Sequence, residues 1–166
     1  MQLSKRKMDG AEAGAPALVW FRQDLRLSDN PALAAAVARG GPVVPVYIWA
    51  PEEEGRWPPG AASKWWLARS LLSLVEDLGR RGSRLIVLRG PSAGALVRLA
   101  AETGAGAVFW NRRYEPAAVA RDRLVEQELR SAGLQAASFQ GSLLFDPEAI
   151  RNRGGQPFRV FTPFWR

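Results

Sequence analysis

Short apolar runs alternate with longer amphipathic stretches along most of the chain. The apolar runs are continuous, with no regular alternation of polar residues, which is typical of strands covered on both faces. They are "ALVWF" (17–21), "VVPVYIWA" (43–50), "RLIVLRG" (84–90), "AVFWN" (107–111) and "LQAASFQ" (134–140). Helices are expected between them at 31–41, 63–82, 91–104 and 115–133. This order predicts an α/β fold with a five-stranded parallel, doubly wound, Rossmann-like sheet flanked by helices.

Prolines and helical periodicity define the expected helices. Asn30 before Pro31 is a good helix start, and Pro91 and Pro116 suit the first turns of two later helices. The Pro/Gly-rich stretch at 51–61 predicts a long loop. In the helix at 63–82, one apolar stripe is expected to face the sheet. Its members are Leu67, Leu71, Leu74, Val75 and Leu78.

The two ends of the chain lack this rhythm. Residues 1–16 are rich in Lys, Arg, Gly and Ala without periodicity, so we expect a flexible leader. After residue 140 no further strand and helix pair follows, and we expect an extended C-terminal segment that packs across the domain and then leads away from it. Its aromatic residues, Phe158, Phe161, Phe164 and Trp165, are expected to be exposed and to promote self-association. We therefore expect a single domain that spans residues 17–166.

Composition narrows the chemistry. The chain has no Cys and no His, which excludes disulfides, thiolate catalysis and the commonest metal ligands, and we expect no metal site. A net charge of +7 would suit a polyanionic partner such as DNA, but many of the arginines are scattered along helix faces, where a solvated surface is the simpler interpretation. No apolar run is long enough to span a bilayer and no secretory signal is evident, so a cytoplasmic protein without membrane contact is expected.

The loop "RQDLRLSDN" (22–30) follows the first strand, where open parallel sheets bind ligands. Capping of the next helix explains Asn30 but not the interleaved charges Arg22, Asp24 and Arg26. Two interpretations stand equally: an ion-pair brace that ties strand to helix, or a ligand site.

Several separated motifs resemble one known family. "VWFRQDLRLSDNPAL" resembles the opening motif of the DNA photolyase/cryptochrome family. "SKWWLARSLLSL", "GSRLIVLRG", "AVFWNRRYEP" with "RDR" (121–123), and "FRVFTPFWR" are similar to later segments of its N-terminal domain, in the same order. The resemblance runs from about residue 17 to 166.

The resemblance implies a division of labour. In this family an N-terminal α/β domain binds a light-harvesting antenna chromophore, and a larger C-terminal helical domain binds FAD and repairs pyrimidine dimers in DNA. That helical domain would follow Arg166, so we expect this chain to depend on it as a partner and to show no lyase activity alone. Two alternatives are a cryptochrome-type photosensor domain and a stand-alone nucleotide- or flavin-binding regulatory module.

Three stretches match the family's antenna pocket, and all lie at carboxyl ends of expected strands. The cofactor-binding candidates are Phe21, Arg22, Asp24, Trp49, Ala50, Lys64, Asn111, Arg112, Arg113 and Glu115. The folate-binding type carries an Asn-Glu pair where this chain has Ala117 and Ala118. A deazaflavin, FMN or FAD antenna is therefore favoured over methenyltetrahydrofolate, and an empty site is the remaining alternative.

Other suggestive features have simpler explanations. Trp20, Trp66 and Trp110 are expected to pack in or beside the core, with no redox role. "GAGAVF" (104–109) precedes a strand and lacks the third glycine of a dinucleotide loop. "RGPSAG" (89–94) lacks the lysine of a phosphate loop and is expected to be a turn leading into a helix.

Overall fold

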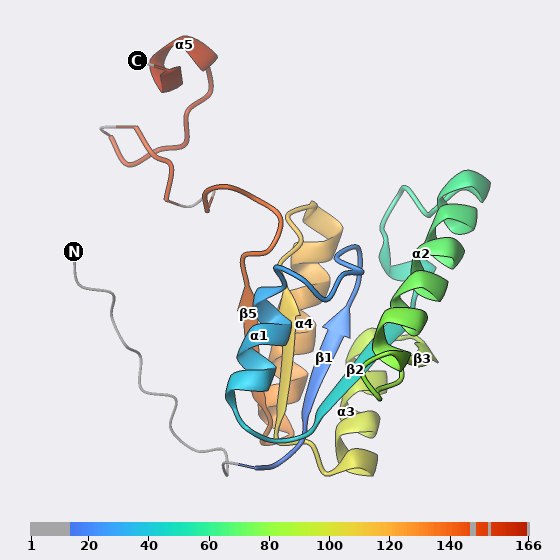
Figure 1. The fold of residues 1–166 in the computed structure, drawn as a ribbon. Helices are drawn as coiled ribbons and strands as arrows, with labels where there is room; N and C mark the ends of the chain where they lie inside the picture. The colour runs from blue at the N-terminus through green and yellow to red at the C-terminus, as the bar shows by residue number, and fades with distance from the viewer. Residues whose placement is uncertain (1–13, 147–148, 153, 166) are drawn as a thin grey trace.

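The computed structural model describes residues 14–146, 149–152 and 154–165. Its five strands are β1 (Ala17–Phe21), β2 (Val43–Trp49), β3 (Ile86–Arg89), β4 (Ala107–Asn111) and β5 (Gln135–Phe139). Its helices are α1 (Pro31–Ala38), α2 (Ala61–Gly79), α3 (Ser92–Thr103), α4 (Pro116–Ser131) and the short α5 (Phe161–Trp165), with a 3-10 turn η1 (Pro51–Glu53). The strands form one parallel sheet in the order β3-β2-β1-β4-β5, which confirms the predicted α/β architecture (Figure 1).

The first strand lies at the centre of the sheet, and the winding reverses beside it. β1 pairs with β2 on one side, with Phe21 opposite Tyr47, and with β4 on the other, with Trp20 opposite Trp110. The carboxyl ends of β1, β2 and β4 are therefore neighbours at one rim of the sheet. This is the rim where open α/β sheets bind ligands.

Each face of the sheet buries its own apolar cluster beneath two helices (Figure 1). On one face α1 and α2 cover Val19, Phe21 and Phe109. On the other, α3 and α4 cover Leu18, together with Trp20 and Trp110. Burial on both faces explains why the strands are continuously apolar, and it confirms the expected packing of the two tryptophans.

Local sequence explains where the helices begin and end. The Asn30 side chain accepts a hydrogen bond from the Leu33 N–H and caps α1, as expected. Pro116 occupies the first turn of α4, whereas Pro91 lies one position before α3 and serves as its cap residue. Gly104 ends α3 with φ +66°, a left-handed conformation that favours glycine.

Helix α2 departs from its predicted burial pattern. Leu74 and Leu78 are buried in the core, but Val75 is 44% exposed and Trp66 is 69% exposed, so both were wrongly expected to pack inward. The reason is tertiary: only the second half of α2 lies against the sheet, while its first half rises beyond the strand ends (Figure 1). Leu67 and Leu71 are half-buried between these regions.

Only the first part of the C-terminal segment packs against the domain as expected. The Gly141 carbonyl accepts a hydrogen bond from Arg26, and Asp146 pairs with Arg112, so this part returns to the rim. The described residues after it run clear of the sheet instead of packing across it, and they end in α5, which was not predicted (Figure 1). The expected leader falls almost wholly outside the described residues. In the part of the chain that is described, every helix is too short or too polar to cross a membrane.

Candidate functional site

The loops after β1 and β4 are joined at the rim by hydrogen bonds. The Asn111 side-chain amide donates to the Asp24 carboxylate at 2.5 Å and to Asn30 at 2.8 Å, and its oxygen accepts from the Ala32 N–H. The Arg22 guanidinium donates to the Asn111 carbonyl oxygen. Because Asn111 is 4% exposed, these bonds satisfy groups that water does not reach.

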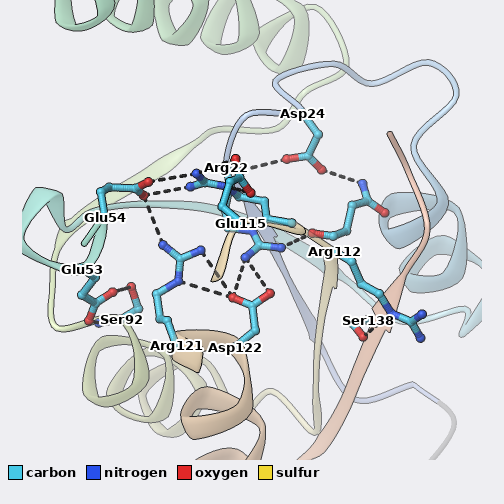
Figure 2. Close-up of polar contacts among 12 residues, drawn as sticks. Arg22, Asp24, Glu53, Glu54, Ser92, Arg112, Glu115, Arg121, Asp122 and Ser138 are labelled. Atoms are coloured by element: carbon cyan, nitrogen blue, oxygen red, sulfur yellow. Dashed lines mark hydrogen bonds and ion pairs between the residues drawn. The ribbon is translucent and has the colours of Figure 1, made fainter. Parts of the chain in front are cut away.

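A network of buried charges continues from this link toward α4 (Figure 2). Arg22 donates to both carboxylate oxygens of Asp122, at 2.7 and 2.8 Å. Arg121 lies 3.3 Å from Asp122 and 3.2 Å from Glu54. Arg113 then binds Glu54 through two nitrogens, at 2.8 and 2.9 Å. These paired charges fix the loops after β2 and β4 against the start of α4.

The pKa shifts follow from burial and from these partners. Burial lowers the pKa of Arg22, although the Asp122 carboxylate opposes this. For Glu54, burial alone would raise the pKa, but hydrogen bonds and charge from Arg113 and Arg121 outweigh it and the pKa is lowered. The ionised carboxylate of Glu54 is therefore its stable form at neutral pH.

Two guanidiniums also enclose one aromatic ring. The Arg22 guanidinium lies 4.7 Å from the centre of the Trp20 ring, and that of Arg121 lies 5.2 Å from it. Both distances are within the range of cation–π attraction. Trp20 thus contributes to the network and also to the apolar core beneath it.

An open cavity of about 960 Å³ lies beside this network, between the carboxyl ends of β1 and β2 and the first half of α2. Its volume falls within the range of small-molecule sites. Tryptophans supply much of its surface, and charges gather where the Glu54 network meets it. It is lined by Trp20, Arg22, Gln23, Leu25, Arg26, Tyr47, Ile48, Trp49, Ala50, Pro51, Glu54, Pro59, Ala62, Ser63, Trp65, Trp66, Leu67, Ser70, Arg113 and Arg121.

The turn that bounds the cavity is fixed from behind. The Glu53 carboxylate accepts hydrogen bonds from the Ser92 N–H at 2.8 Å and from its hydroxyl at 2.5 Å, as Figure 2 shows. This side chain therefore satisfies the start of α3 and ties η1 to it. The residue that follows, Glu54, is thereby directed into the charged network.

Four of the ten candidate residues line the cavity. Arg22 and Arg113 contribute guanidiniums, and Trp49 and Ala50 contribute the end of β2. Glu115, outside the cavity, pairs with Arg113 at 3.1 Å. The loops after β1, β2 and β4 thus converge at a single rim.

The remaining five candidates lie away from the cavity surface. Phe21 is fully buried in the core, and Asp24 and Asn111 join the β1 and β4 loops. Lys64 is exposed on α2 and does not line the cavity, although Ser63 and Trp65 beside it do. Arg112 turns to the other side of β4, where it donates to Ser138 (Figure 2).

Several lining residues were not among the candidates. Tyr47 and Glu54 flank the predicted end of β2, and their closeness to the cavity follows from the strand order. Arg121 lies far along the chain on α4; "RDR" (121–123) is part of the family resemblance but was not assigned to the pocket. The exposure of Trp65 and Trp66 depends on how far α2 extends beyond the sheet.

Comparison with known proteins gives consistent relatives. A deoxyribodipyrimidine photo-lyase of Agrobacterium fabrum is 50% identical over 152 residues, which are 92% of this chain and 31% of that protein. Cryptochrome-1 of Arabidopsis thaliana is 42% identical over 159 residues, or 95% of this chain and 23% of the relative. The chain therefore spans less than a third of the length of either protein.

Solved structures agree with the sequence comparisons. A bacterial class III photolyase from Agrobacterium tumefaciens superposes with a TM-score of 0.85 at 47% identity, covering 96% of this chain and 32% of that one. An archaeal photolyase from Sulfolobus tokodaii, solved with two FAD molecules, gives 0.74 at 27% identity, covering 83% and 32%. The family model for DNA photolyase matches residues 17–166. The chain belongs to the DNA photolyase family.

Proposed function

We propose that the cavity binds a planar antenna chromophore, and that residues 17–166 form the light-collecting domain of a photolyase-family protein. The observation that carries this proposal is the cavity itself, at the carboxyl rim of the sheet, with Trp49, Trp65 and Trp66 among its lining residues. Flat aromatic surfaces bind a flat pigment through stacking and apolar contact. The charged groups at one end would orient its polar edge.

A flavin-type or deazaflavin pigment is the favoured ligand. Ala117 and Ala118 occupy the positions at which folate-binding relatives carry an Asn-Glu pair. Ala118 is buried, and a Cβ built on Gly55 would lie 2.9 Å from the Ala117 Cβ, so the turn covers this place closely. A folate could not use those side chains here. The Sulfolobus tokodaii relative was solved with two FAD molecules, implicating a novel light-harvesting cofactor.

In the complete protein, this domain would pass excitation to FAD in a C-terminal helical domain that splits cyclobutane dimers in DNA. A cytoplasmic location fits that role. The similarity to Arabidopsis cryptochrome-1 supports a second candidate, a photosensor that uses the same pocket. Pigment binding by this domain would serve either function, and repair of a dimer-containing oligonucleotide by the complete protein would distinguish them.

Equilibrium dialysis of the chain with FMN, FAD, a deazaflavin and methenyltetrahydrofolate, read by absorbance, tests the pigment. We expect retention of a flavin or deazaflavin and none of the folate. Retention of folate alone would overturn the assignment of pigment class, and retention of none would overturn the function.

A pair of variants localises the binding site. Trp66→Ala should weaken binding about tenfold or more because a stacking surface is lost, with little change in stability since Trp66 is largely exposed. Trp57→Ala is the matched control, because Trp57 is 88% exposed and does not line the cavity. Equal effects of the two substitutions on affinity would place the pigment elsewhere.

A further inference from the structure

Tyr47 occupies an unusual position on the cavity wall. It lies on β2, opposite Phe21 of β1, and is only 8% exposed. Its neighbours on the strand, Ile48 and Trp49, also line the cavity and are apolar. A phenol hydroxyl is thus located on a mainly apolar part of the surface.

This hydroxyl makes no hydrogen bond to any other residue that the structure describes. The guanidiniums and carboxylate nearby are engaged: Arg22 with Asp122, and Arg113 and Arg121 with Glu54. The Tyr47 hydroxyl is not fully enclosed, because it is not among the buried unpaired atoms of the described residues and its residue lines the cavity. A ligand in the cavity could therefore replace water as its hydrogen-bond partner. The Tyr47 hydroxyl can thus form a hydrogen bond with a molecule in the cavity.

The hydroxyl remains protonated under physiological conditions. Burial, with a further contribution from the Glu54 carboxylate, raises the pKa of Tyr47 to about 12. A neutral phenol can donate one hydrogen bond and accept others, whereas a phenolate could only accept. The group therefore suits a ligand that offers a hydrogen-bond acceptor.

We propose that Tyr47 is a specificity-determining residue whose hydroxyl donates a hydrogen bond to a carbonyl oxygen or ring nitrogen on the edge of the bound pigment. This inference rests on the proposed function. It restricts the ligand to flat heteroaromatic compounds with an acceptor edge. A hydrocarbon dye of the same size would leave the hydroxyl unpaired and bind more weakly.

The test compares Tyr47→Phe with Tyr114→Phe, which remove the same atom from the only two tyrosines of the chain. The Tyr114 hydroxyl is buried without a hydrogen-bond partner among the described residues, and Tyr114 does not line the cavity. Affinity for FMN, or for whichever pigment the wild-type chain retains, is measured by fluorescence titration. The urea midpoint of each ligand-free variant is measured alongside.

We expect Tyr47→Phe to raise the Kd about five- to tenfold and Tyr114→Phe to leave it unchanged. The urea midpoint of the ligand-free Tyr47→Phe chain should stay close to that of wild type, because the Tyr47 hydroxyl makes no hydrogen bond to another described residue. An unchanged Kd for Tyr47→Phe, or an equal rise in both variants, would overturn the inference.

A second measurement on the wild-type chain avoids dependence on the variant's folding. With tyrosine labelled by ¹³C at Cζ, pigment binding should shift one of the two resonances, assigned to Tyr47 by its persistence in Tyr114→Phe. Binding without that shift overturns the role of Tyr47 alone. A wild-type chain that retains no pigment overturns the proposed function, and this inference with it.

Discussion

The two sides of the carboxyl rim differ in how their polar groups are paired. Beside β1 and β4, buried charges are closely paired, as in Arg22 with Asp122 at 2.7 Å. Beside β2 and α2, the rim is open and lined by aromatic rings, and the Tyr47 hydroxyl has no partner among the described residues. Buried charges require partners for stability, whereas a binding surface needs groups that stay available. The comparison separates residues that shape the rim from residues free to contact a ligand.

This contrast bears on the two interpretations of the loop after β1, a brace or a ligand site. Asp24 is a brace, since it accepts hydrogen bonds from the Arg22 N–H and from Asn111 and does not line the cavity. Arg22 belongs to both groups, because it is paired with Asp122 and also borders the cavity. Gln23, Leu25 and Arg26 of the same loop also line the cavity, together with residues of β2 and α2.

The largest expected effect comes from breaking the paired side. Asp122→Ala leaves the buried Arg22 without its carboxylate and should lower the free energy of unfolding by about 3–5 kcal/mol. Urea denaturation at pH 7 measures this loss. Asp77→Ala is the control, because it breaks an exposed pair with Arg80 and should cost less than about 1 kcal/mol. Similar losses in both variants would show that the buried network contributes no special stability.

A smaller effect is expected where the two sides meet. Glu54→Gln weakens the pairing with Arg113 and Arg121 and should lower the free energy of unfolding at pH 7 by about 1–2 kcal/mol. Because the folded-state pKa of Glu54 is lowered, its contribution is present above the unfolded pKa of about 4.3 and is lost as the pH falls through the folded value.

The pH dependence of the free energy of unfolding therefore tests whether the pKa of Glu54 is lowered in the folded state. The difference between wild type and Glu54→Gln should stay constant from pH 7 to about pH 5 and should diminish below about pH 4. Glu115→Gln is the matched control; its carboxylate also pairs with Arg113, but it is 52% exposed and its loss should matter less. A difference that grows on acidification would contradict the assigned direction.

The smallest effect on folding is expected far from the rim. In α5, Phe161 stacks on Trp165 with ring centres 5.9 Å apart, and both rings are largely exposed. Replacing both by Ser should change the free energy of unfolding of the α/β body by less than about 0.5 kcal/mol. The same change should reduce concentration-dependent self-association in gel filtration, because the two most exposed rings of the aromatic patch are removed. A wild-type chain that stays monomeric at high concentration would contradict this expectation.

Much of the fold could be predicted because its signals are local. Continuous apolar runs gave β1 and β4 with the observed ends, and Asn30 with Pro31 marked the start of α1. Errors arose where burial depends on distant contacts. Val75 falls on the apolar stripe of α2 but is exposed, because the helix follows the sheet over only part of its length.

The candidate site could be predicted only in part. Strand ends indicated the rim and several residues on it, since parallel strands present their carboxyl ends together. The direction of each side chain was not available from position alone. Lys64 and Trp65 are adjacent in α2, yet only Trp65 lines the cavity. The "RDR" motif containing Arg121 is part of the family resemblance, but its contact with Glu54 and its place at the cavity could not be predicted from the local pattern.

The sequence by itself determined the alternation of strands and helices, the parallel sheet and the rim where a ligand would bind, because these follow from local periodicity and chain connectivity. Only the tertiary structure decided which charged side chains form ion pairs with each other and which groups face an open cavity. Whether Asp122 meets Arg22 depends on the packing of α4 against the sheet, across 100 residues of sequence. Such pairing depends on distances in space, which hydrophobic periodicity does not encode.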